Sequence, residues 1–301
     1  MKSSSITLCG NLILDIVNEV PSFVESGSNI CLKKNNTVGA IGNIVSFISM
    51  LDNDTTIDVQ GAVGIDRDGR YIIKWLENFK KLNNQNISCN IQELKNHPTS
   101  NAYIISDLSS RKRTSIVQWG ACTEIKNYSN KNKWFHLLYA DTLSNINLLD
   151  LEKISKKAII SMDLCLHSHH FQKKSMILKS LEYVDFLIAS DMELLSVTGL
   201  KNKNKAVKLL GSLCRGWCIM HFPEGSVSSN GDDVIELQVE AIKKDINVLG
   251  AGDMFFSSFF TNMNGQDINK DNVQTALKHS HKTTGAFLQG ENHVNLVSLY
   301  L

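Results

Sequence analysis

The sequence predicts an α/β protein with a mostly parallel central sheet flanked by helices. Short apolar runs alternate along the chain with longer stretches of helical periodicity, which is typical of sheets whose strands are joined by helices. Hydrophobic residues make up 43% and charged residues 20% of the 301 residues, enough for a sizeable core. The polar and glycine-containing motifs fall at the ends of these runs, where parallel sheets bind their ligands.

The predicted strands are short apolar runs. They lie at residues 6–9, 59–64, 137–140, 158–162, 186–189 and 217–220. The first predicted helix contains Ile44, Val45, Phe47, Ile48 and Leu51, whose spacing places them on one face. A second, amphipathic helix is predicted over residues 71–82. The later strands are each followed by a helical stretch, as expected for a parallel sheet with helices on both faces.

Two stretches interrupt this pattern. Residues 17–38 are polar and poor in strand signals. Residues 101–119 contain two strand-like runs, 102–106 and 114–118, which are separated by polar residues in the pattern of a hairpin. We interpret both stretches as excursions from the sheet that form a small β lid on a single domain spanning residues 1–301.

Composition argues against several classes of protein. The 31 basic and 30 acidic side chains nearly cancel, so no excess of positive charge indicates nucleic-acid binding. No run reaches the 18 or more apolar residues of a membrane span. The seven cysteines include no CxxC pair, which favours reduced thiols and a cytoplasmic location. The P-loop, the dinucleotide-binding fingerprint and the serine-hydrolase and zinc-protease motifs are absent from the sequence.

The strongest chemical signal is the turn Gly250-Ala251-Gly252-Asp253, which precedes a very apolar helical stretch. Free N–H groups at a helix N-terminus bind anions, and the missing side chains let a phosphate approach the backbone. A carboxylate in the first turn can accept a proton from an alcohol. Anion site and base together are what phosphoryl transfer to a hydroxyl requires. The simpler alternative is that Asp253 only caps the helix.

At this turn the sequence resembles the ribokinase-type (PfkB) sugar and nucleoside kinases, whose signature is D-T-x-G-A-G-D. The resemblance covers nearly the whole chain. Segment 10–15 matches the strand-end glycine and the following substrate-binding Asp, and segment 38–43 keeps the second glycine and the Asn of G-G-x-x-x-N. Segment 61–69 matches G-x-x-G-x-D-x-x-G completely, and segment 113–121 is similar to the lid strand and its turn.

The resemblance implies a ribokinase-like three-layer fold and a set of site residues. Asp253 would be the catalytic base, and the amides of Gly250, Ala251 and Gly252 would stabilise the transferred group. The acceptor would be held by Asp15, Gly39 and Asn43, with Asn101 at the base of the lid as a further candidate. Simpler readings exist: Asp15 as a turn cap, Asn43 as a helix N-cap and Asn101 as an ordinary strand-end residue. We expect segment 61–69 to be architectural, with Asp66 capping its turn.

On the nucleotide side the chain departs from the family pattern. Segment 190–193 keeps Glu193, which would hold Mg²⁺ through water, but has Ser190 in place of Asn. Segment 221–225 begins with His221 instead of Thr and ends with Gly225, and its Pro223 cannot donate an N–H to phosphate. We assign Ser190, His221 and Gly225 to the nucleotide. Residues 247–249 read Asn-Val-Leu where D-T-x is expected, which argues against activation by a monovalent cation such as potassium.

The function this implies is ATP- and Mg²⁺-dependent phosphorylation of a hydroxyl, expected to be a primary alcohol, on a sugar or sugar derivative. A nucleoside kinase on the same scaffold is the first alternative. A catalytically weak sugar- or nucleotide-binding protein is the second, because of the departures on the nucleotide side. The partners expected are small-molecule substrates, with neither nucleic acid nor membrane. The apolar lid residues Ile104, Ile116 and Val117 would suit a homodimer formed through the lid or a face turned to the chain's own cleft.

Overall fold

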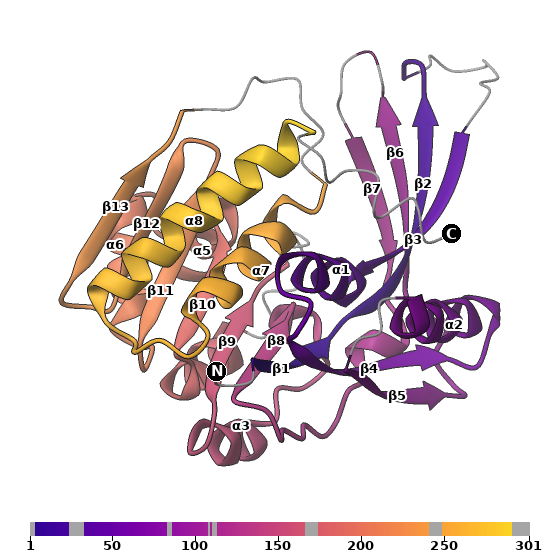
Figure 1. Ribbon diagram of the computed structural model, residues 1–301, viewed down its shortest axis with the longest axis horizontal. Helices are drawn as coiled ribbons and strands as arrows, with labels where there is room; N and C mark the ends of the chain where they lie inside the picture. The colour runs from indigo at the N-terminus through magenta and orange to yellow at the C-terminus, as the bar shows by residue number, and fades with distance from the viewer. Residues whose placement is uncertain are drawn as a thin grey trace.

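The computed structural model describes residues 4–23, 33–82, 86–107, 109, 113–165, 174–240 and 249–290. Within these ranges the chain forms one nine-stranded sheet and one four-stranded sheet (Figure 1). Helices lie on both faces of the larger sheet, and the smaller sheet projects from one side of the molecule.

The nine-stranded sheet is mostly parallel, as the sequence predicts. Its order is β13-β12-β11-β10-β9-β8-β1-β4-β5, and only the β11–β12 and β12–β13 pairs are antiparallel. The strands are β1 Ser5–Gly10, β4 Thr56–Gly64, β5 Ile87–Leu94, β8 Trp134–Leu138, β9 Ile159–Asp163, β10 Phe186–Ser190, β11 Trp217–Phe222, β12 Gly225–Ser229 and β13 Val234–Gln238. Five of the six predicted strands are confirmed. The sixth, predicted at 137–140, is displaced, because β8 begins at Trp134 and ends at Leu138. The sequence missed β5 and β13, which are edge strands and need no continuous apolar run, and it missed β12, which lies inside the sheet but is mostly serine.

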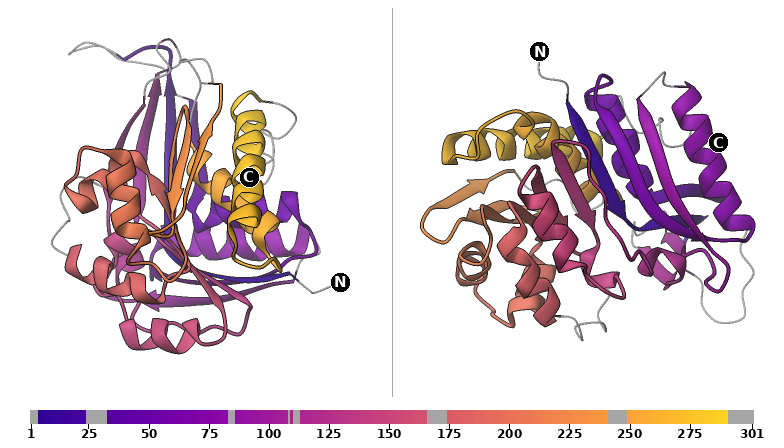
Figure 2. Two further views of the ribbon diagram at one scale, coloured as in Figure 1. Left: turned by 90° about the vertical axis from the view of Figure 1, so that its left-hand side faces the viewer. Right: turned by 90° about the horizontal axis from the view of Figure 1, so that it is seen from below.

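Eight α-helices in the described ranges cover this sheet. They are α1 Ile41–Leu51, α2 Arg67–Leu82, α3 Leu148–Ser155, α4 Lys174–Ser180, α5 Asp191–Thr198, α6 Lys203–Gly211, α7 Ala251–Met263 and α8 Lys270–Leu288. One buried cluster joins the sheet to α1, α2, α7 and α8, and a second joins it to α3, α4, α5 and α6. Ile6 and Leu8 belong to the first cluster and Cys9 to the second, because successive side chains of a strand point to opposite faces. The result is a three-layer α/β fold (Figure 2).

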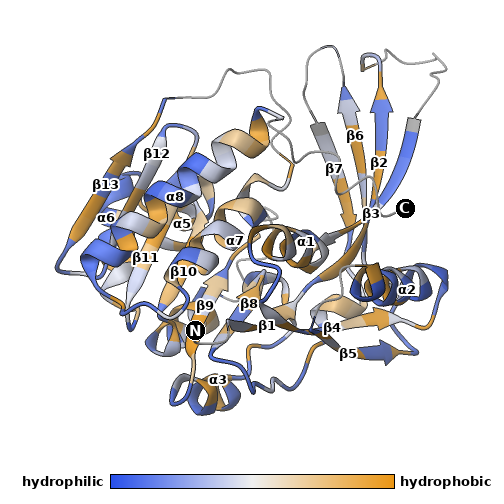
Figure 3. Ribbon diagram, viewed as in Figure 1, coloured by the Kyte–Doolittle hydropathy of each residue, from blue (hydrophilic) through white to orange (hydrophobic). Residues whose placement is uncertain are grey.

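The surface helices follow the expected burial pattern. Helix α2 buries Gly69, Ile72, Leu76 and Phe79, which are three or four residues apart and therefore share a face. Hydrophobic and hydrophilic residues accordingly alternate along α2 in Figure 3. Helix α7 instead buries both sides of its apolar stretch, because it lies between α1 and α8 and over the sheet.

The four-stranded sheet corrects one prediction and confirms another. Its order is β3-β2-β6-β7, with β2 Leu12–Val20, β3 Lys33–Ala40, β6 Asn101–Asp107 and β7 Arg113–Gln118. The hairpin predicted within 101–119 is therefore confirmed. The prediction that 17–38 is poor in strands is wrong, because β2 and β3 pair antiparallel through its two ends. Its polar residues occupy an edge strand, where backbone pairing rather than apolar content sustains the structure.

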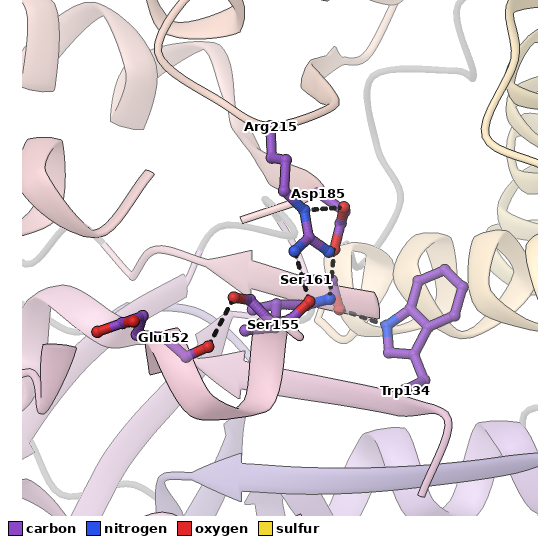
Figure 4. Close-up of polar contacts among 7 residues, drawn as sticks. Trp134, Glu152, Ser155, Ser161, Asp185 and Arg215 are labelled. Atoms are coloured by element: carbon purple, nitrogen blue, oxygen red, sulfur yellow. Dashed lines mark hydrogen bonds and ion pairs between the residues drawn. The ribbon is translucent and has the colours of Figure 1, made fainter. Parts of the chain in front are cut away.

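A polar contact network ties the ends of the central strands together (Figure 4). The Arg215 guanidinium forms two bonds to Asp185, Nε to Oδ1 at 2.7 Å and Nη2 to Oδ2 at 2.6 Å. Its Nη1 donates to the Ser155 carbonyl at 2.6 Å, and the Ile160 amide donates to Asp185 Oδ2 at 2.8 Å. A planar guanidinium paired twice with one carboxylate is a strong and directional contact. It links the start of β9 and the end of α3 to the turns before β10 and β11.

In the parts of the chain that the structure describes, no helix is both long and apolar enough to serve as a membrane span. The six cysteines in these ranges all carry free thiols.

Candidate active site

The predicted anion site forms the N-terminus of α7. Gly250 is the N-cap residue, with φ 79° and ψ 3°, a left-handed conformation that glycine adopts without strain. A side chain at this position would also meet the Phe47 ring at 3.4 Å. Ala251, Gly252 and Asp253 form the first turn, where backbone N–H groups have no partner within the helix. The alternative in which Asp253 caps the helix is wrong, because Gly250 occupies that position.

Asp253 is buried and held by a residue from another helix. Its side chain is 7% exposed, and its Oδ2 accepts a hydrogen bond of 2.8 Å from Asn43 Nδ2. Helices α1 and α7 lie side by side, which brings these two residues together across 210 positions of sequence (Figure 1). Asn43 is the third residue of α1, and Ala40 is its N-cap, so the N-cap reading of Asn43 is also wrong. The bond orients the carboxylate while leaving the Asn43 carbonyl oxygen for another partner.

Asp15 and Gly39 lie on neighbouring strands and touch. A Cβ atom on Gly39 would lie 2.2 Å from Asp15 Oδ2, so only glycine leaves room for the carboxylate. Asp15 is 7% exposed and sits in the middle of β2, which excludes its reading as a turn cap. The structure thus pairs two of the predicted acceptor residues at the junction of the small sheet and α1.

Asn101 begins β6, the strand that pairs with β2, and its register partner is Leu14 beside Asp15. The Asn101 side chain is 7% exposed, and its Oδ1 has no hydrogen-bond partner among the described residues. Buried polar atoms are nearly always hydrogen-bonded in folded proteins. The unpaired oxygen therefore indicates a site at which a ligand hydroxyl could donate.

Two non-glycine residues in the described ranges have positive φ. One lies at the end of β3 in the four-stranded sheet, and the other follows the end of β8 in the nine-stranded sheet. Ala40, with φ 54°, links β3 to α1, and Tyr139, with φ 55° and ψ 49°, links β8 to the short helix η2 Ala140–Thr142. Such conformations cost about 1–3 kcal/mol each and cluster at ligand sites. The sequence reasoning missed Tyr139, because its strand-end position carried no motif.

Three carboxylates gather near the ends of β8, β9 and β10. They are Asp141 in η2, Asp163 at the end of β9 and Glu193 in the first turn of α5. Burial, together with the charges of Glu193 and Asp253, raises the pKa of Asp163 well above its usual range. Burial raises the pKa of Glu193 to about 7, although hydrogen bonds from Ser190 oppose the shift. A nearby cation would stabilise the ionised form of both groups.

This donor set fits Mg²⁺, the metal expected from the resemblance. Mg²⁺ typically uses one or two carboxylates, several waters and substrate phosphates, not a complete cage of protein ligands. Asp141, Asp163 and Glu193 interact electrostatically, but among the described residues no three His, Cys, Asp or Glu side chains are close enough to hold a metal ion by themselves. Glu193 also has a structural contact: its Oε2 accepts from the Ser190 amide at 2.6 Å, and Ser190 Oγ accepts from the Glu193 amide at 3.4 Å. Ser190 and Glu193 together form a capping box on α5.

The two remaining nucleotide candidates have different surroundings. The His221 side chain reaches the anion site: a Cβ on Gly252 would lie 3.9 Å from His221 Cε1. Burial, assisted by the nearby His281, lowers the pKa of His221 to about 4, so its imidazole is neutral at neutral pH. Gly225 lies after the two-residue turn between β11 and β12, and a Cβ there would lie 1.9 Å from the Leu237 carbonyl oxygen. Hairpin packing alone therefore explains Gly225.

Segment 61–69 is architectural, as predicted. Asp66 accepts hydrogen bonds from the Gly69 amide at 2.8 Å, the Thr99 amide at 2.7 Å and the Thr99 hydroxyl at 2.6 Å. These bonds fix the start of α2 to the segment that leads into β6. Residues 247 and 248, on which the expectation about potassium depends, lie outside the described residues.

Comparison with known proteins places this geometry in a family context. The profile of the pfkB family carbohydrate kinases matches residues 23–283. No curated protein sequence matches the chain. Among solved structures, a ribokinase from Giardia lamblia superposes with a TM-score of 0.77 at 19% identity, covering 98% of this chain and 97% of that one. An adenosine kinase from Sinorhizobium meliloti gives 0.70 at 17%, covering 99% and 98%. A fructokinase from Vibrio cholerae O395, with fructose, ADP and calcium bound, gives 0.72 at 16%, covering 95% and 93%.

Proposed function

Since this chain belongs to the pfkB family of carbohydrate kinases, which transfer a phosphoryl group to an alcohol, we propose that it transfers the γ-phosphoryl group of ATP to a sugar or sugar derivative. The acceptor group is expected to be a primary alcohol. The observation that carries the proposal is the buried Asp253 carboxylate, held by Asn43 in the first turn that follows the left-handed Gly250. A protein that only bound its ligand would need no such base.

In the proposed reaction, Asp253 accepts the proton of the acceptor hydroxyl while that oxygen attacks the γ-phosphorus. The bond between the γ-phosphorus and the oxygen bridging to the β-phosphate breaks, and ADP leaves. The amides of Gly250, Ala251 and Gly252 stabilise the charge on the transferred group, helped by the positive end of the α7 dipole. Asn43 keeps the carboxylate aimed at the acceptor.

The acceptor is held on the side of the small sheet. Asp15 accepts hydrogen bonds from two hydroxyls of a polyol, and Gly39 leaves room for the Asp15 carboxylate that receives them. The unpaired Asn101 Oδ1 accepts a further hydroxyl, which satisfies a buried atom that otherwise lacks a partner. The small sheet acts as a lid that excludes water from the reacting groups.

The nucleotide is held on the side of β10 and β11. The neutral His221 imidazole can donate to a phosphate oxygen beside Gly252, where Pro223 provides no N–H. Ser190 and Gly225 shape the same edge. Mg²⁺, held through Glu193 and Asp163, would neutralise phosphate charge. The solved fructokinase with ADP bound supports a nucleotide on this scaffold.

The lid also suggests how the protein assembles. Ile104 is buried at 4% exposure, whereas Ile116 is 63% and Tyr103 46% exposed. We propose that Ile116 and Tyr103 contribute to a homodimer formed through the lid of this single-domain chain. Light scattering after size exclusion should then show a dimer that Ile116→Asp converts to a monomer, and an unchanged mass would contradict it.

A coupled assay of ADP release tests the proposed function. The panel contains pentoses, hexoses, sugar acids, amino sugars and nucleosides, each with and without potassium. ADP release that depends on a sugar supports the proposal, and release that depends on a nucleoside supports the alternative kinase. Slow, acceptor-independent hydrolysis across the whole panel would show a binding protein instead.

A further inference from the structure

Tyr139 occupies the centre of the candidate active site although no motif marks it. It follows β8, which lies between β1 and β9 in the central sheet (Figure 1). Strand β1 leads into β2 and Asp15, and β9 ends at Asp163. Because the three strands are parallel, their carboxyl ends meet at one edge, and Tyr139 stands in the middle of that edge.

The backbone of Tyr139 is held in a left-handed conformation by specific contacts. Its carbonyl accepts from the Thr142 amide at 3.0 Å and from Thr142 Oγ1 at 2.8 Å. The Thr142 hydroxyl in turn contacts the buried Asn11, whose Nδ2 donates to it at 3.0 Å. Side chains other than glycine persist in this conformation only where their surroundings determine it. The fold therefore holds the tyrosine in place against a local preference for glycine.

The Tyr139 side chain is close to residues from both halves of the site. Tyr139 is half-buried, and its apolar part packs against the core beneath α1 and α7. Its phenol group is within electrostatic reach of Asp253, Cys165, Asp163 and Asp15, which come from α7, the end of β9 and β2. A tyrosine hydroxyl is protonated at neutral pH and can therefore donate a hydrogen bond.

We propose that Tyr139 determines acceptor specificity: its hydroxyl donates a hydrogen bond to an oxygen of the acceptor held by Asp15, and its ring limits how large an acceptor can reach Asp253. The favoured acceptor is a compact monosaccharide, and a nucleoside is disfavoured because the ring takes up space between the acceptor carboxylate and the base. This inference rests on the proposed function and deepens it.

The test compares Tyr139→Phe and Tyr139→Gly with the wild type, using D-ribose, D-fructose and adenosine as probe acceptors. Tyr139→Phe keeps the ring and removes the donor, so the KM of the phosphorylated sugar should rise about 3- to 10-fold, as for one lost hydrogen bond, with the KM of ATP unchanged. Tyr139→Gly suits the left-handed backbone and opens the pocket. It should raise the ratio of kcat/KM for adenosine over the sugar about tenfold or more.

Tyr128→Phe is the matched control. Tyr128 is also buried, donates to the Asn145 carbonyl at 3.4 Å and packs against Phe135 in the opposite core layer. The Tyr128→Phe variant should therefore have the same KM for the sugar and for ATP as the wild type.

Two results would overturn the inference alone: an unchanged sugar KM in Tyr139→Phe, or equal rises in the KM of sugar and ATP, which would indicate a structural role. A wild type that prefers adenosine overturns the inference and also supports the nucleoside kinase over the proposed sugar kinase. If Tyr139→Phe does not fold, the selectivity of Tyr139→Gly decides, and an unchanged ratio overturns the inference. If another sugar of the panel is the better acceptor, it replaces D-ribose and D-fructose in this test. A wild type that phosphorylates no acceptor of the whole panel overturns the proposed function and this inference with it.

Discussion

Replacement of Asp253 by Asn tests the centre of the mechanism, because it removes the base while preserving the shape of the side chain. Loss of a positioned general base lowers kcat by about 10²- to 10⁴-fold. At about 1.4 kcal/mol per factor of ten, this corresponds to about 3–5.5 kcal/mol of the activation barrier. The variant should therefore lose nearly all turnover with any acceptor that the wild type phosphorylates.

The same substitution should affect stability far less. The 2.8 Å contact from Asn43 Nδ2 can be kept, since an amide oxygen replaces the carboxylate oxygen as acceptor. A hydrogen bond to a charged group contributes about 1.5–3 kcal/mol and a neutral one about 0.5–1.5, so the loss is about 1–1.5 kcal/mol. Asp253 is only 7% exposed, so the neutral amide also avoids the free-energy cost of burying a charged carboxylate, and this offsets part of the loss. We expect the Tm to fall by a few degrees at most.

The assay is steady-state ADP release at saturating acceptor and ATP, combined with a thermal melt. The control is Asp271→Asn, because Asp271 occupies the first turn of α8 and is exposed. It loses the same favourable interaction with a helix dipole but has no proposed role in the reaction. A folded Asp253→Asn protein whose kcat stays within tenfold of the wild type would refute the assignment of the base.

Three further predictions concern the acceptor, the core and pH. Gly39→Ala places a Cβ 2.2 Å from Asp15 Oδ2 and should displace the carboxylate. The KM of the acceptor should then rise at least about tenfold, as for a lost charged hydrogen bond, with little change in the KM of ATP. An acceptor KM equal to that of the wild type would contradict the pairing of Asp15 with Gly39. Arg215→Ala leaves the buried Asp185 carboxylate without its partner and should lower the free energy of unfolding by about 3 kcal/mol in urea titrations, and a loss below about 1 kcal/mol would contradict it. Burial lowers the pKa of His136 to about 3, below the value of about 6.5 expected in the unfolded chain, so protons bind the unfolded state preferentially and stability falls as the pH drops from about 6.5 towards 3. Urea titrations at pH 7.5, 6 and 5 measure how steeply the free energy of unfolding depends on pH. This slope should be smaller in His136→Phe by up to about 1.4 kcal/mol per pH unit, and an unchanged slope would contradict the prediction.

The central strands and the catalytic turn were predictable because their signals are local. A buried parallel strand such as β10 needs a short apolar run, and the left-handed turn at the start of α7 favours the glycine at position 250. Strands β3 and β12 were not predictable in this way. They are stabilised by pairing with β2 and β11, and residue type alone carries little information about such partners.

The nucleotide candidates also combine features that are local in the sequence with features that depend on tertiary packing. The capping box of Ser190 and Glu193 is a local pattern, yet the pKa of about 7 at Glu193 depends on burial that only the packed fold creates. Gly225 matched a family position in the sequence, but the Leu237 carbonyl oxygen leaves no room for a Cβ atom there, which is a packing requirement of the β12–β13 hairpin.

By itself, the sequence determined the three-layer α/β class and the helix start at the Gly250–Asp253 turn, because strand–helix alternation and a glycine-rich helix start depend on neighbours along the chain. Only the tertiary structure decided that Asn43 holds Asp253 across 210 residues, that Asp15 lies against Gly39, and that Tyr139 comes within electrostatic reach of Asp15 and Asp253. These contacts depend on which strand ends and helices meet in space. The position of a residue along the chain does not specify that arrangement until the sheet has formed and its helices have packed.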